Sequence, residues 1–105
     1  MKEIEFIQTL QNIFFTGEHA ALATIVRTRG STPRKAGSKM IIYPSGRIIG
    51  TVGGGCGEGE VIEKALKVIN TGQPVTHEVD LTTGLLYEDG GICGGIMDVF
   101  IEPLL

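Results

Sequence analysis

The chain has 105 residues, the size of one ordinary domain, and 42% of them are hydrophobic, which excludes intrinsic disorder. Its formal net charge of −3 argues against a nucleic-acid binder, which would carry a strong basic excess. No stretch approaches the ~20 apolar residues of a membrane span, and the acidic start is unlike a signal peptide. The two cysteines are too few for a disulfide framework. We therefore expect a cytoplasmic protein with free thiols and with neither nucleic-acid nor membrane partners.

The first half of the chain predicts one helix and three strands. Apolar residues at helical spacing predict an amphipathic helix over residues 3–15. Residues 20–29 are apolar and rich in β-branched side chains, which predicts a mostly buried strand. Two shorter strands are expected over residues 39–43 and 47–52. The Pro-Ser-Gly turn between them is typical of a hairpin.

The second half begins with a glycine run and continues into a helix that ends near residue 70, before Gly72 and Pro74. A short strand is predicted over residues 76–81, and a last strand over 96–102, before Pro103. Helices mixed with hairpin-linked strands indicate an α+β fold. We expect a single domain over residues 1–105, with two main helices and a mixed or antiparallel sheet of about five strands.

The glycine run at residues 53–59 lies between a predicted strand and a predicted helix. Bare backbone amides at a helix N-terminus suit an anion such as phosphate. The alternative is a tight turn that needs glycine for its shape alone. The run has neither the Walker A pattern nor the dinucleotide-binding pattern. The candidate ligand-binding glycines are Gly53, Gly54, Gly55 and Gly57.

Cys56 lies inside this run. A helix N-terminus favours the thiolate, which can attack sulfur, carry a persulfide or ligate a soft metal such as molybdenum. Glu58 and Glu60 act in the opposite direction, because nearby negative charge raises a thiol pKa. Cys56 could also be a small residue that merely fits the turn.

Cys93 is flanked by glycine pairs, as in the first run, within a predicted loop over residues 82–95. Two cysteines cradled by glycine in one small domain suggest a shared site. A zinc site is not expected, because neither cysteine has a partner at C-x-x-C spacing. His19 and His77 are isolated and are interpreted as surface or strand residues.

A second polar turn follows the first long strand and contains Ser31, Thr32 and Arg34. These side chains offer hydroxyls and a cation to a phosphate or a polar heterocycle. Several basic residues gather between residues 27 and 39, as a solvated face or as a local anion patch. Asp80 and Thr82 are interpreted as a turn-capping pair.

Five segments of the sequence together resemble the XdhC/CoxI family, the accessory proteins of xanthine dehydrogenase and carbon monoxide dehydrogenase. They are residues 29–34, 37–40, 50–58, 93–95 and 98–103. The resemblance implies binding and protection of the molybdenum cofactor as cargo and its delivery to an apo molybdenum hydroxylase. It also implies a link to sulfuration, with a cysteine desulfurase as sulfur donor.

The resemblance also implies roles for individual residues. Cys56 and Cys93 would be the thiols near the metal or the sulfur in transit, and residues 53–55 would receive the phosphate or pterin. Ser31, Thr32 and Arg34 would complete the anion contacts.

Many relatives continue into a second, Rossmann-like domain, which is not expected within these 105 residues. A separate Rossmann-domain chain or a homo-oligomer would then supply the missing half, unless none is supplied. We expect a chaperone that is not an enzyme. The alternatives are a persulfide carrier that uses Cys56, or a docking module that binds no cofactor.

Overall fold

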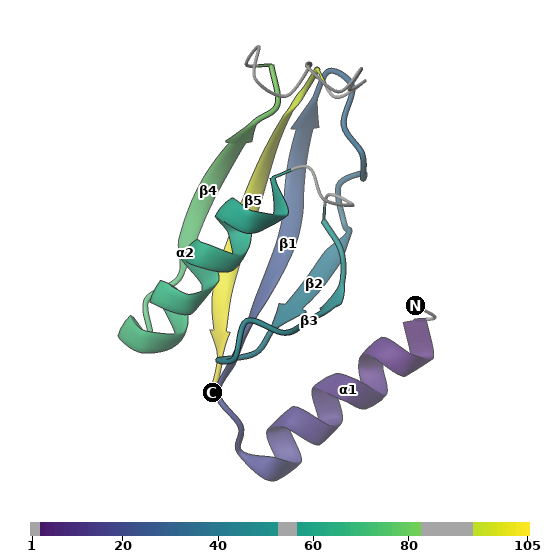
Figure 1. Cartoon of the computed structure of the whole chain (residues 1–105). Coiled ribbons are helices and arrows are strands. Elements are labelled where there is room, and N and C mark those ends of the chain that lie inside the picture. The colour runs from purple at the N-terminus through teal and green to yellow at the C-terminus, as the bar shows by residue number, and fades with distance from the viewer. Residues whose placement is uncertain (1–2, 53–56, 83–93) are drawn as a thin grey trace.

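The computed structural model describes residues 3–52, 57–82 and 94–105. Its elements, in chain order, are α1 (Glu3–Thr16), β1 (Ala20–Arg29), β2 (Lys39–Ile42), β3 (Ile48–Gly50), α2 (Glu58–Thr71), β4 (Val75–Asp80) and β5 (Ile96–Leu104). The strands form one sheet in the order β3-β2-β1-β5-β4, and every neighbouring pair is antiparallel (Figure 1). The predicted α+β fold with five strands and two helices is confirmed.

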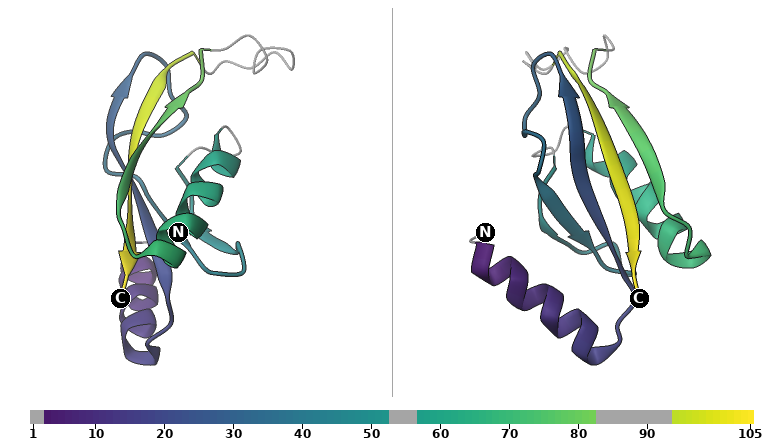
Figure 2. Two further views of the ribbon diagram at one scale, coloured as in Figure 1. Left: turned by 90° about the vertical axis from the view of Figure 1, so that its left-hand side faces the viewer. Right: turned by 180° about the vertical axis from the view of Figure 1, so that it is seen from behind.

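The main core lies between α2 and one face of the sheet, which we call the inner face (Figure 2). Strand side chains alternate between faces, so every second residue of β1 and β5 points toward α2. Val61, Ala65 and Val68 form the buried stripe of α2, as their helical spacing predicts. The strand residues buried in this core are Ala21, Ala23, Ile25, Met40, Ile42, Val79, Met97, Val99 and Ile101.

A smaller cluster forms on the opposite, outer face, where α1 packs beside β2. Ile13 is the one residue of α1 that is fully buried. It lies with Ala20, Ile41, Tyr43 and Leu104, and with half-buried residues of α1 and β3. The helix ends at Gly17, whose φ of 72° and N–H bond to the Ile13 carbonyl (3.0 Å) form a left-handed cap. Neither helix in the described ranges has the length and apolarity needed to cross a bilayer.

The third strand is shorter than the predicted span of residues 47–52. Its last residue is Gly50, with a φ of 82° that takes the backbone out of the extended region. A Cβ at this position would lie 2.7 Å from the Lys39 carbonyl oxygen. The close approach to β2 therefore requires glycine, and the same glycine ends the strand.

The last strand is longer than predicted, because Pro103 does not end it. Pro103 pairs with Ala21 of β1, and the strand continues to Leu104. The pairing between β4 and β5 stops at Val75 and Ile101. Beyond that point β5 has a neighbour on one side only, so a residue without an N–H is tolerated there.

A bulge in β1 changes the direction of its last side chains. Ile25 pairs with Val99, whereas Arg27 pairs with the next residue of β5, Asp98. Val26 is the extra residue and is 53% exposed. The bulge moves the following arginines from the inner to the outer face, where charged groups can be solvated.

Candidate functional site

Three chain segments meet at the end of the sheet where β1 and β4 finish and β5 begins, which we call the loop end (Figure 1). Two backbone hydrogen bonds join them. The Gly94 N–H donates to the Ser31 carbonyl (3.1 Å), and the Leu81 N–H donates to the Gly95 carbonyl (2.9 Å). The turn after β1 is therefore bonded to Gly94, and the next residue, Gly95, is bonded to Leu81 directly after β4.

Gly95 lets these segments approach one another. A Cβ on this buried residue would lie 2.6 Å from the Ser31 carbonyl oxygen and 2.7 Å from Thr32 Cγ2. Gly30 faces it and has a φ of 74°. A Cβ on Gly30 would lie only 3.1 Å from the Gly95 Cα. Two glycines therefore allow the backbones of the turn and of β5 to lie in direct contact.

The predicted binding residues of the turn are in reach of solvent. The Thr32 hydroxyl donates to the Arg34 carbonyl (2.9 Å), which fixes the turn. The Arg34 guanidinium donates to the Pro33 carbonyl (3.1 Å) and is otherwise exposed. Ser31 is exposed as well. The turn therefore presents a cation beside ordered backbone.

Gly57 is the one predicted glycine ligand of residues 53–57 that the structure describes. It precedes α2 with a φ of 77°, and a Cβ on it would collide with Val79 Cγ1. Core packing is thus sufficient reason for glycine here. The other predicted glycine ligands and both predicted thiols lie outside the described residues. These are Gly53, Gly54, Gly55, Cys56 and Cys93.

Leu81 connects the start of α2 with the loop end. A Cβ placed on Gly57 would lie 3.6 Å from Leu81 Cδ2, and the backbone N–H of the same leucine bonds to Gly95. Leu81 is fully buried. Gly57, which follows Cys56, therefore lies close to the side chain of a residue whose N–H bonds to Gly95, two residues after Cys93 and directly before β5.

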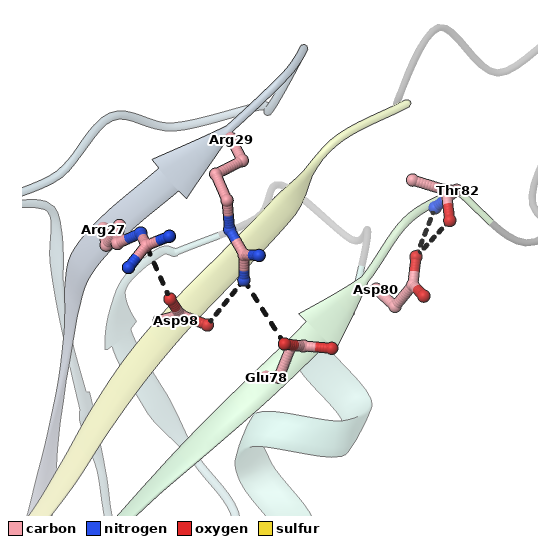
Figure 3. Close-up of polar contacts among 6 residues, drawn as sticks. All are labelled: Arg27, Arg29, Glu78, Asp80, Thr82 and Asp98. Atoms are coloured by element: carbon pink, nitrogen blue, oxygen red, sulfur yellow. Dashed lines mark hydrogen bonds and ion pairs between the residues drawn. The ribbon is translucent and has the colours of Figure 1, made fainter.

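A row of charges crosses the outer face next to the loop end (Figure 3). One Arg29 nitrogen lies 3.3 Å from Glu78 Oε2 and 3.4 Å from Asp98 Oδ1. Arg27 Nε lies 3.9 Å from the other oxygen of Asp98. Glu78 and Asp98 therefore balance the charge of these two arginines, whose side chains stay exposed.

Asp80 caps the end of β4, as its pairing with Thr82 in the sequence predicted. Its carboxylate accepts from the hydroxyl of Thr82 (2.5 Å) and from the backbone N–H of the same residue (2.8 Å; Figure 3). These two hydrogen bonds, and then the positive charge of Arg29, lower the pKa of Asp80 below its ordinary value of 3.8. The cap fixes the direction in which the chain leaves the sheet.

Three other cations, Arg34, Lys35 and Lys39, have no carboxylate partner among the described residues. The sequence left open whether the basic cluster is a solvated face or an anion patch. The structure divides it into paired arginines on the outer face and unpaired cations after β1. The second group is the one that retains positive charge for a ligand.

Two of these cations line a groove of about 610 Å³ beside α1. One wall is the apolar side of the helix, with Phe6, Ile7 and Leu10. Arg34 and Lys39 lie on the other side, and Gly50 and Thr51 also line it. The sequence did not reveal this groove, because the apolar stripe of the helix is equally typical of a buried face.

His77 is a strand residue, as predicted, but it has a partner that the sequence did not indicate. Its Nε2 lies 3.2 Å from Glu60 Oε1 at the start of α2. Within the described ranges, no three His, Cys, Asp or Glu side chains are grouped to hold a metal ion. The described part of the site thus offers amides, hydroxyls and cations, which suit an anionic ligand.

A solved structure has the same fold. The crystal structure of a xanthine dehydrogenase from Bacillus halodurans matches the whole of this chain with a TM-score of 0.85 and 34% sequence identity. The match covers 31% of that protein. The arrangement of sheet and helices is therefore one that occurs within a larger polypeptide.

Residues 16–80 match the XdhC and CoxI family, and the chain belongs to that family. Its relatives include the "Uncharacterized protein YqeB" of Escherichia coli (40% identical over 82 residues) and a probable xanthine dehydrogenase subunit of Bacillus subtilis (38% over 89). A third is the "Molybdenum cofactor insertion chaperone PaoD" of E. coli (36% over 90). The matches cover 78%, 83% and 85% of this chain, but only 15%, 27% and 28% of the relatives.

Proposed function

We propose that this chain binds the molybdenum cofactor as cargo and assists its sulfuration and its insertion into a xanthine dehydrogenase-type hydroxylase. In this role it is a chaperone and not an enzyme, and it works in the cytoplasm. Its partners are the apo-hydroxylase and a cysteine desulfurase. A separate Rossmann-domain chain or a second copy of this chain completes the assembly.

The observation that carries the proposal is the convergence at Leu81. A Cβ on Gly57 would lie 3.6 Å from Leu81 Cδ2, and the Leu81 N–H donates to the Gly95 carbonyl. These glycines lie one residue after Cys56 and two residues after Cys93 in the chain. One described residue from each predicted thiol segment therefore lies near Leu81, and this proximity supports the proposal of a shared site.

The chemistry of the turn after β1 supports an anionic cargo. The Gly94–Ser31 hydrogen bond fixes this turn to the residue that follows Cys93. Arg34 is exposed there without a carboxylate partner among the described residues. In this role, the cysteines meet the metal or the sulfur in transit, residues 53–55 receive the phosphate or pterin, and Ser31, Thr32 and Arg34 complete the anion contacts.

The proposal is tested by cofactor retention. Purified wild-type chain is mixed with molybdenum cofactor and desalted, and the retained molybdenum and pterin are measured. We expect retention by the wild type, and a loss of about tenfold or more in at least one of Cys56→Ala and Cys93→Ala, because a soft metal loses its thiolate. Lys67→Ala, on the exposed side of α2, is the matched control and should retain cofactor fully.

Two other outcomes would contradict the proposal. A folded wild type that retains neither molybdenum nor pterin would indicate a docking module. Cysteine variants that retain cofactor fully but lose sulfur transfer would indicate a persulfide carrier. Mass spectrometry after exposure to a cysteine desulfurase checks the second outcome, because a persulfide adds one sulfur atom to Cys56.

A further inference from the structure

We infer that the groove between α1 and residues 34–39 is a binding site for a phosphorylated planar heterocycle, a class that includes pterin monophosphates. The identity of this ligand rests on the proposed function, since the cargo carries a pterin and a phosphate. The groove itself is defined by charge, shape and the covering helix. The described residues that line it are Glu3, Phe6, Ile7, Leu10, Arg34, Gly37, Ser38, Lys39, Gly50 and Thr51.

The cationic wall is suited to a phosphate. Arg34 donates to the Pro33 carbonyl, and the Lys39 Nζ lies 3.3 Å from the Gly37 carbonyl. These neutral contacts orient the two side chains without cancelling their charge. Arg27 and Arg29, by contrast, are already paired with carboxylates. Phosphate would give the groove cations the charged partner that the described residues do not supply.

The helical wall is suited to a flat ring. Phe6 and Leu10 are half-buried, and Ile7 is 48% exposed, so apolar surface faces the opening. A volume of about 610 Å³ lies within the usual range of small-molecule sites, ~300–1,000 Å³. Glu3 also lines the groove, but it belongs to the helix. A negatively charged group of the ligand would therefore bind on the side of Arg34 and Lys39, away from Glu3.

The groove is connected to the start of α2. Thr51 lines it, and the Thr51 hydroxyl donates to the Glu58 carboxylate in the first turn of the helix. Gly50 lines it as well and is fixed against Lys39 of β2 by its left-handed backbone. The groove is therefore held to both α2 and the sheet, and a ligand in it would extend the proposed cofactor site toward α1.

The test uses the full chain labelled with ¹⁵N and neopterin monophosphate as the probe. We expect amide shifts at Gly37, Ser38, Lys39, Gly50 and Thr51 on titration. Neopterin and inorganic phosphate, each alone, should bind about tenfold or more weakly, because each lacks one wall's partner. The shifts also show directly which residues the probe approaches.

Variants of the two walls sharpen the test. Arg34→Ala and Lys39→Ala should each weaken binding of the probe by about tenfold, since each removes a charged hydrogen-bond donor. Ile7→Asp should weaken it further by placing charge on the apolar wall. Arg47→Ala is the control: this cation lies 4.4 Å from the Tyr43 ring centroid, does not line the groove, and should leave binding unchanged.

Three results would overturn the inference: no binding of the probe, shifts confined to residues 30–32 and 81–82 with none in the groove, or shifts that follow protein concentration without probe. The last would indicate an interface between two copies. Failure of the proposed function is separate. If the groove variants retain cofactor fully while the cysteine variants lose it, the groove inference is contradicted and the proposed chaperone function is supported. If the chain binds the probe but retains no cofactor, the groove inference is supported and the proposed function is contradicted.

Discussion

The two faces of the sheet differ in how completely they are covered. On the inner face, α2 and the strands bury a cluster in which most side chains have no exposed surface at all. On the outer face, α1 buries only Ile13 fully and leaves Ile4 at 63%, Phe14 at 52% and Phe15 at 91% exposed. The inner face therefore supplies the stability of the domain, while the outer face and α1 remain available for contacts with other molecules.

The largest expected effect comes from the inner face. Ile101→Ala removes a fully buried side chain from the centre of β5 and leaves a cavity beneath α2, so we expect unfolding free energy to fall by about 2–5 kcal/mol. Ile4→Ala in α1 is the control and should change it by less than about 0.5 kcal/mol. Urea unfolding followed by circular dichroism measures both. Equal losses would mean that the two faces do not differ as described.

The next effect tests the loop end, where both faces finish. Gly95→Ala would place a Cβ 2.6 Å from the Ser31 carbonyl oxygen, and we expect a loss of about 1–3 kcal/mol from the forced backbone shift. Gly59→Ala, in the first turn of α2, has no neighbour within 4 Å and should be neutral or slightly stabilising. Thermal unfolding compares the two. A neutral Gly95→Ala would show that the contact between the turn and β5 is loose.

The smallest effect lies among the outer-face charges. Thr82→Val removes the hydroxyl that donates to Asp80, so the pKa of that carboxyl should rise toward 3.8. Carbon-13 NMR titration of the side chain measures it, with Thr76→Val on the same strand as control. Because the pKa is lowered on folding, this contribution is present above the unfolded value and is lost as pH falls through the folded one. An unchanged pKa in Thr82→Val would contradict the assigned cause.

The sequence predicted the elements well because each has a strong local signal. Apolar and β-branched residues predicted β1 with its exact bounds, and the apolar row at Val61, Ala65 and Val68 predicted the buried side of α2. The predicted bounds are wrong where contact with a neighbouring strand determines the end of a strand. Gly50 ends β3 because of its approach to β2, and Pro103 is accepted because β4 has already stopped.

The candidate site was predictable in its chemistry but not in its geometry. The polar turn at Ser31, Thr32 and Arg34 could be read from residue types, and so could the cap at Asp80. The contact of Gly95 with that turn could not, because it joins segments more than sixty residues apart. The bulge at Val26, which decides which arginines face acids, leaves no distinct local signal either.

The hydrogen bond between Leu81 and Gly95 has a consequence for how the family can diversify. It joins the last residue before the intervening stretch to the residue directly before β5, so the described scaffold closes across this point. Doubling the length of the intervening stretch would alter the entropy of closure by only about 0.6 kcal/mol. Evolution can therefore change the length and sequence between these two residues without rebuilding the sheet and helices that carry them.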